Sequence, residues 1–129
     1  MSRQNSSLSP KVHRFSADKE YLSEEGCYIN ELSNDADDPA VSIAQARVAV
    51  GDTTAWHRLT GIVERYVVIS GTGLAEVSEA APLPVGPGDV VIVPAGSRQR
   101  ISNSGQNDLV FLCICTPRFE WQYYERLEP

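Results

Sequence analysis

The stretch 51–71, which reads GDTTAWHRLTGIVERYVVISG, decides the fold. Its second half, 63–70 (VERYVVIS), is rich in β-branched residues and runs into Gly71-Thr72-Gly73, a pattern typical of a strand that ends in a hairpin turn. Because side chains along a strand point alternately to opposite faces, Glu64 and Tyr66 share one face. We therefore expect two polar side chains on the same side of an otherwise apolar strand.

Other short apolar segments, separated by glycine and proline, extend outward from this stretch on both sides. No window carries an apolar stripe with a helical period, and strands that recur every 8–12 residues or so predict a sandwich or barrel. The parity of the apolar residues switches within 41–50, which predicts a β-bulge there. The continuous apolar run 89–93 predicts a strand that is buried on both faces. The expected strands are 27–32, 41–50, 63–70, 74–77, 89–93, 98–103 and 108–115.

Three polar residues are expected to converge inside this barrel. His57 precedes the central strand, Glu64 lies on it, and Gln99 lies on the segment 98–103 with Ile101 on the same face. Burying these groups without partners would cost several kcal/mol. We therefore expect them to bind one another, water, a metal ion or a ligand.

The spacing of these residues resembles the two sequence motifs of the cupin superfamily. The first motif matches at Gly51, His57, Glu64 and Gly71, and the second at Gly88, Pro94, Gly96, Gln99 and Asn103. The resemblance covers about 51–117 and is to small, single-domain cupins of the bacterial type. It implies an all-β double-stranded β-helix, also called a jelly-roll barrel, over 21–129, with an aromatic C-terminal tail and a flexible N-terminal arm over 1–20.

In the family, two histidines and the glutamate of the first motif bind a divalent metal together with the histidine of the second. Here Leu59 and Gln99 stand at two of the histidine positions, so the metal motif is degenerate. The resemblance carries His57 and Glu64 over as metal ligands, and Gln99 only as a position that offers an amide oxygen. Such a set could hold iron, nickel, manganese or zinc, with water at the open positions.

Three functions remain open at this point. The first is a metal-dependent enzyme of the dioxygenase, decarboxylase or isomerase type that acts on a small polar substrate, with Tyr66 as a proton donor. The second is a metal-free acid–base enzyme that uses His57 as a base tuned by Glu64. The third is a cupin that binds or senses a ligand without transforming it. Family precedent places the first ahead, and Gln99, Tyr66 and Cys115 are the expected ligand contacts.

Side chains outside the motif have simpler interpretations. Cys113 and Cys115 share a face and predict small apolar fillers, with Cys115 the nearer to the pocket. Trp56 has the opposite parity to His57 and is expected outside the pocket. The aromatic tail 119–124 predicts packing across the barrel or a partner subunit, and the alternative is a lid over the pocket. The resemblance implies a homodimer that pairs through the outer sheet.

Composition excludes several partners. The formal net charge is −6 and no basic stripe is visible, which argues against nucleic acid and against an anionic membrane surface. No run of about 18 apolar residues and no signal-peptide pattern occurs. Three cysteines without framework spacing fit a reducing compartment, so we expect a cytoplasmic protein.

Overall fold

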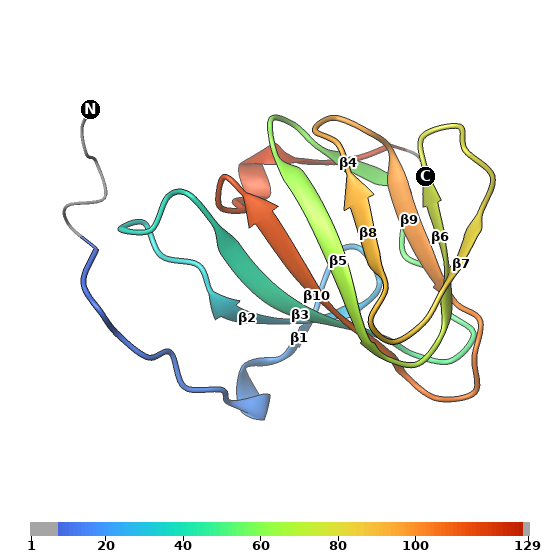
Figure 1. The fold of residues 1–129 in the computed structure, drawn as a ribbon, viewed down its shortest axis with the longest axis horizontal. Helices are drawn as coiled ribbons and strands as arrows, with labels where there is room; N and C mark the ends of the chain where they lie inside the picture. Colours follow the sequence, from blue (N-terminus) through green and yellow to red (C-terminus); the bar gives the residue numbers. More distant parts are fainter. Residues whose placement is uncertain (1–7, 128–129) are drawn as a thin grey trace.

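A computed structural model describes residues 8–127 of the chain, which form two antiparallel sheets that face each other (Figure 1). The strands are β1 (Tyr21–Leu22), β2 (Tyr28–Ser33), β3 (Ser42–Val48), β4 (His57–Leu59), β5 (Val63–Ser70), β6 (Gly73–Val77), β7 (Leu83–Val85), β8 (Val90–Val93), β9 (Gln99–Asn103), β10 (Leu109–Thr116) and β11 (Tyr124–Arg126). One sheet has the order β1-β2-β3-β10-β5-β8 and the other β11-β4-β9-β6-β7. Strand β10 inserts between β3 and β5, as in a jelly roll, and the predicted fold is confirmed.

The core follows the alternation of side chains along the strands. On β5, Glu64, Tyr66 and Val68 are buried, whereas Val67 is half-buried and Ile69 is exposed on the outer face. Each fully buried aliphatic or aromatic side chain contributes about 1.5–3 kcal/mol to folding. The most deeply buried large members of the apolar core, each at most 2% exposed, are Val48, Val68, Val93, Ile101, Leu109 and Phe111.

The hairpin predicted at Gly71–Gly73 is wrong, because β5 and β6 belong to different sheets and the turn links the two sheets.

Two details of the predicted strands themselves are also wrong. Strand β3 pairs with β10 in unbroken register over Ser42–Val48, and the irregularity lies in β2 between Glu31 and Ser33. Strand β8 is an edge strand whose residue Ile92 is 64% exposed. Both errors have one cause, because the outer face of this sheet is itself apolar. There Ile43 pairs with Ile114, so an apolar side chain need not face the core.

The N-terminal segment lies against the outside of the barrel. Lys11 and His13 contact Asp35, and Asn30 donates a hydrogen bond to the carbonyl of Ser16. Helical structure within residues 8–127 consists of short 3-10 turns, η2 (Ala17–Lys19) and η3 (Trp121–Tyr123), and no helix there is long and apolar enough to cross a membrane. Residues 1–7 lie outside the described residues, and the flexibility of 1–20 stays a prediction.

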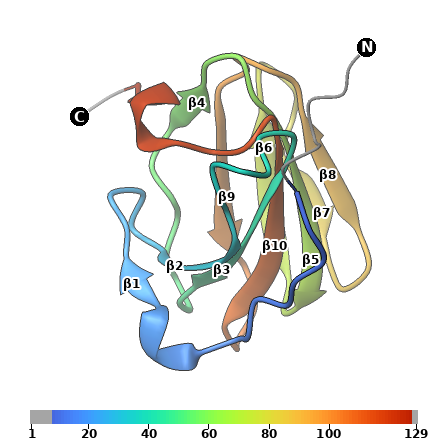
Figure 2. The same cartoon turned by 90° about the vertical axis from the view of Figure 1, so that its left-hand side faces the viewer.

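The aromatic tail returns to the barrel. After η3, strand β11 pairs with β4, and Tyr124 lies opposite Leu59. Figure 2 shows this C-terminal segment, in red, passing beside β4 at one end of the barrel. The pairing brings the tail next to His57, the first residue of β4.

Gly51 and Gly71 of the motif share a left-handed backbone conformation but differ in the space around them. Gly71 has a φ of +84°, and a Cβ added there would lie 2.5 Å from the backbone oxygen of Asp108. Gly51 has nearly the same φ, +83°, but a Cβ there would meet nothing within 4 Å.

We predict that Gly51→Ala lowers the free energy of unfolding by about 1–2 kcal/mol, the cost of a left-handed conformation. Gly71→Ala lowers it by roughly a further 1–3 kcal/mol, because the backbone at Asp108 must also move. Urea unfolding of the two variants measures the difference. Equal losses of unfolding free energy in the two variants would show that the close approach of Asp108 to Gly71 does not add to the cost of a side chain there.

Candidate functional site

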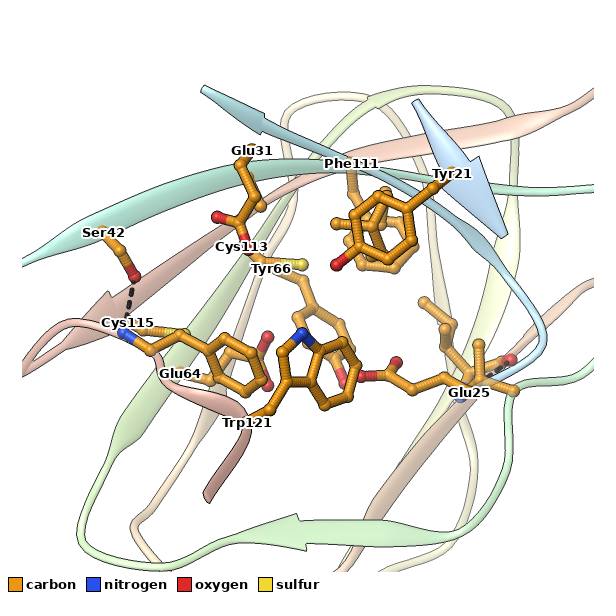
Figure 3. A pocket seen from close by; sticks show the side chains of 16 residues that line it. Tyr21, Glu25, Glu31, Ser42, Glu64, Tyr66, Phe111, Cys113, Cys115 and Trp121 are labelled. Atoms are coloured by element: carbon orange, nitrogen blue, oxygen red, sulfur yellow. Dashed lines mark hydrogen bonds between the residues drawn. The ribbon is translucent and has the colours of Figure 1, made fainter. Parts of the chain in front are cut away.

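A pocket opens between the two sheets at the end of the barrel where the tail lies (Figure 3). Its empty volume is about 550 Å³ with the open mouth included. Most of the wall is apolar or aromatic. The charged residues in the wall are glutamates, contributed by the β1–β2 turn, β2 and β5: Glu25, Glu31 and Glu64.

Glu64 is the deepest of these carboxyl groups. It lies on β5, is 8% exposed, and its Oε1 has no hydrogen-bond partner among the described residues. Burial, and then the charge on Glu25, raise its pKa to about 8, against the smaller opposing effects of hydrogen bonds with Cys113 and Gln99. The carboxyl is therefore largely protonated at neutral pH, and both of its forms are present near pH 8.

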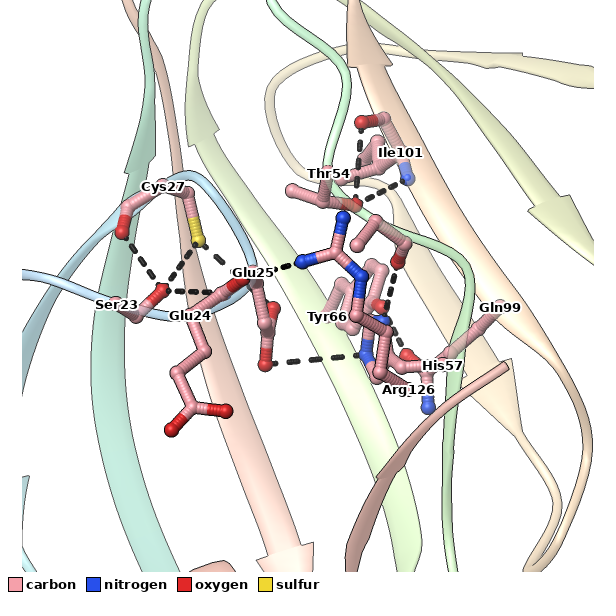
Figure 4. Close-up of polar contacts among 11 residues, drawn as sticks. Ser23, Glu24, Glu25, Cys27, Thr54, His57, Tyr66, Gln99, Ile101 and Arg126 are labelled. Carbon is pink, nitrogen blue, oxygen red and sulfur yellow. Dashed lines mark hydrogen bonds and ion pairs between the residues drawn. The ribbon is translucent and has the colours of Figure 1, made fainter. Parts of the chain in front are cut away.

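Gln99 and Tyr66 hold each other beside Glu64. The Tyr66 hydroxyl donates a hydrogen bond to Oε1 of Gln99 (Figure 4). Gln99 also acts on Glu64 and opposes the rise of its pKa. Burial, and then the charge of Glu64, raise the pKa of Tyr66 well above its usual value, so this hydroxyl keeps its proton.

His57 lies behind the pocket wall. Its Nδ1 is 2.7 Å from the carbonyl oxygen of Ala55, and because a carbonyl only accepts, Nδ1 carries the hydrogen. Its Nε2 faces Oε2 of Glu25 at 3.8 Å (Figure 4). The ring of Tyr124 stacks on the imidazole, with 5.2 Å between the ring centroids. His57 thus adjoins the site through its contact with Glu25.

Sequence reasoning missed Glu25. This residue lies in the turn between β1 and β2, where Gly26 adopts a φ of +92° and Ser23 accepts a hydrogen bond from the Glu25 amide. The turn folds the carboxyl back toward the barrel. No motif spacing marks this position, because the turn lies outside the stretch that matches the cupin pattern.

The remaining predicted contacts are distributed around the pocket. Glu64, Tyr66 and Cys115 line it, and Cys113 does so too. Phe119 and Trp121 of the tail also line it, so the tail packs across the barrel end beside the pocket, and the lid alternative stays a prediction.

Trp56 lies outside the pocket, as its parity predicts, with the guanidinium of Arg98 3.6 Å from its ring centroid and that of Arg100 4.4 Å. The thiol of Cys115, which lines the pocket, is buried. Burial raises its pKa, so it stays protonated as an apolar filler does.

The donor set does not fit a divalent transition metal. Leu59 is buried in an apolar cluster, and the amide oxygen of Gln99 is occupied by the Tyr66 hydroxyl. Among residues 8–127, no group of three His, Cys, Asp or Glu side chains is arranged to hold a metal ion. Protein sites for such metals use at least three donors. The ligand role of His57, Glu64 and Gln99 stays a prediction, and no step below uses it.

An antiparallel jelly-roll barrel with an interior pocket defines the class of double-stranded β-helix proteins. The family model of the cupin domain matches residues 44–115. The chain belongs to the cupin family. An uncharacterized protein of Methanocaldococcus jannaschii is 30% identical over 112 residues, which cover 85% of this chain and 89% of that protein.

Solved structures share the fold at lower identity. An uncharacterized double-stranded β-helix protein of Klebsiella pneumoniae superposes with a TM-score of 0.73 at 17% identity, covering 92% of this chain and 100% of that one. The nucleoside dehydratase Pac13, from Streptomyces, gives 0.73 at 16% identity and 92% of both chains. A protein of Thermotoga maritima described as a predicted oxalate decarboxylase gives 0.64 at 24% identity, with 70% and 80% covered. These likenesses show the fold alone.

The raised pKa of Glu64 predicts how stability depends on pH. Between its ordinary pKa of 4.5 and its folded value of about 8, the folded protein holds a proton that the unfolded chain has lost. The stabilisation is complete below pH 4.5 and is lost as pH rises through 8, with a slope that approaches about 1.4 kcal/mol per pH unit. Urea unfolding across this range measures the slope, and Glu64→Gln removes its contribution. Parallel curves for the two proteins would contradict the assignment.

Proposed function

We propose that this cupin is a metal-independent enzyme of the isomerase type that moves a proton on a small polar molecule bound in the barrel. The observation that carries the proposal is the carboxyl of Glu64. It is buried, lines the pocket, lacks a partner at Oε1 among residues 8–127 and has a pKa of about 8. A group that titrates near the working pH both accepts and donates protons efficiently.

The proposed step is a proton transfer next to a carbonyl group of the substrate. Ionised Glu64 takes the proton from the hydroxyl-bearing carbon next to the carbonyl, and the C–H electron pair moves into an enediolate. The proton of that hydroxyl passes to the former carbonyl oxygen, and the Glu64 carboxyl returns its proton to the former carbonyl carbon, so that the carbonyl and the hydroxyl exchange places. The reaction needs no oxidant, because no electrons leave the substrate. Burial, and then the charge on Glu25, raise the pKa of Glu64, and His57 Nε2 lies 3.8 Å from Oε2 of Glu25.

Tyr66 and Gln99 act as positioning residues in this proposal. The Tyr66 hydroxyl fixes the amide of Gln99, which in turn orients the Glu64 carboxyl. Phe119 and Trp121 cover part of the mouth, which favours exclusion of water from the reacting carbon.

The comparisons support a small-molecule activity without specifying it. Pac13 is described as a nucleoside dehydratase, and its variants with Tyr-to-Phe and His-to-Gln substitutions were solved with uridine. A barrel of similar shape thus holds a molecule of that size in that protein. The cytoplasmic location of this chain stays a prediction.

We predict proton exchange as the first measurable activity. A panel of hydroxyaldehydes and hydroxyketones, with and without amino groups, is incubated with the protein in D₂O and EDTA, and NMR follows deuterium uptake at carbon. Glu64→Gln slows the exchange by about 100-fold or more, because the proton-transfer group is lost.

Glu79→Gln is the matched control, since the Glu79 side chain is 89% exposed and its contact is with Arg98. Exchange that stops in EDTA and returns with added metal would overturn the metal-independent mechanism. Exchange that persists in Glu64→Gln would remove Glu64 from it.

We also propose the homodimer that the family resemblance implies. The outer face of β5 and β8 carries Ile69, Val90 and Ile92, which are 51%, 55% and 64% exposed. A second copy that covered this face would remove these side chains from water.

We predict that Ile92→Glu converts a dimer to a monomer in light scattering after gel filtration, because a charge would be buried in the interface. Leu83→Glu, at an equally exposed position on β7 of the other sheet, keeps the dimer. A wild-type protein that runs as a monomer would contradict the proposal.

A further inference from the structure

We infer, building on the proposed function, that the molecule bound in this pocket carries a positively charged nitrogen, which Glu25, Glu31 and the aromatic residues at the mouth hold. The ligand class is thus a small organic ammonium compound. Glu64 lies deeper in the same pocket and faces the reacting part of the molecule.

The first argument is the balance of charge. Glu25, Glu31 and Glu64 line the pocket, and no lysine or arginine of residues 8–127 does so. His57 faces Glu25 at 3.8 Å, and a single imidazole neutralises at most one of the three carboxyl groups. An anionic ligand would add to this repulsion, whereas a cation relieves it.

The positive charge that acts on Glu31, that of Arg118, is already engaged outside the pocket. Arg118 donates a hydrogen bond of 2.8 Å to Asn34 and lies 3.4 Å from Glu120. Burial still raises the pKa of Glu31 above its usual value, although the Asn34 hydrogen bond and the charge of Arg118 oppose the shift. Glu31 therefore remains a carboxyl group whose charge the protein does not fully offset.

A second, independent observation points to a ligand. Oε1 of Glu64 is buried and has no partner among the described residues, although the side chain faces the open pocket. A buried polar atom without a partner is costly, and a molecule in the pocket would provide one. A cation there would also favour the ionised form of Glu64, which is the form that abstracts a proton in the proposed mechanism.

The mouth supplies aromatic rings of the kind that bind cations. Tyr21 and Trp121 are 38% and 39% exposed and line the pocket with Phe119. Burial raises the pKa of the Tyr21 hydroxyl, Trp121 opposes the rise, and the charges of Glu31 and Glu25 add to it. In the view of Figure 3, Trp121 lies between Glu64 and Glu25, with Tyr21 nearby. Carboxylates beside aromatic rings attract an ammonium group through both ion pairing and cation–π contact.

Calorimetric titration of the full chain with three probes of similar shape tests the inference. Choline carries the charged nitrogen, 3,3-dimethylbutan-1-ol is its neutral isostere, and 3,3-dimethylbutanoate is an anion of similar size. We expect choline to bind at least 10-fold more tightly than the alcohol, and the anion to bind more weakly than both. Equal or tighter binding of the alcohol, or no binding of choline, would overturn the inference.

Variants assign the binding to the pocket. Glu25→Gln weakens choline binding by about 10-fold or more and leaves the alcohol unchanged, whereas the surface variant Glu79→Gln changes neither. Trp121→Leu, at a half-exposed position in the mouth, provides a second test if Glu25→Gln lowers the melting temperature. Choline affinity that is the same in both pocket variants would overturn the inference.

The two proposals fail separately. Selective choline binding without proton exchange on any substrate would remove the enzyme and leave a cation-binding cupin. Proton exchange on uncharged substrates, together with a preference for the neutral probe, would leave the enzyme and remove the cation.

Discussion

The carboxyl of Glu64 is held inside an apolar barrel by the pairing of β5, and the rest of the site follows from this constraint. Strand β5 is paired on both sides, with β10 and β8, so Glu64 cannot turn outward unless every side chain of the strand changes face. The core residue Val68 would then lose its place as well. Burying the apolar side chains of β5 therefore also buries the Glu64 carboxyl. The loss of water around this carboxyl raises its pKa and favours the protonated form.

The surrounding polar groups come from the opposite sheet and are in register with each other. His57 on β4 lies opposite Gln99 on β9, so one strand pairing places both behind the pocket. Gln99 reaches Glu64 and Tyr66 across the barrel, whereas His57 reaches Glu25. The site thus has two parts: the paired strands β4 and β9, and the β1–β2 turn, which supplies the carboxyl group of Glu25.

Sequence reasoning found the part of the site that lies on regular strands. Alternation along 63–70 and 98–103 gave the inward positions of Glu64, Tyr66 and Gln99, and glycine and proline spacing gave the barrel. It could not find Glu25, because the direction of a turn depends on contacts far away in sequence. The apolar outer face misled it twice, at β3 and β8, since alternation alone does not distinguish a core from a covered or exposed surface.

The replacement of two metal-ligand positions by Leu59 and Gln99 changes what the pocket requires. A divalent ion would have neutralised the inward carboxyl groups. With Leu59 in an apolar cluster and the Gln99 oxygen occupied by Tyr66, that charge must be offset in another way. A bound proton neutralises the carboxyl of Glu64, which is buried. Glu25 and Glu31 lie nearer the mouth, beside aromatic rings. A positively charged ligand would offset the charge of both Glu25 and Glu31. The excess of negative charge in a pocket without a metal ion then selects a cation as its ligand.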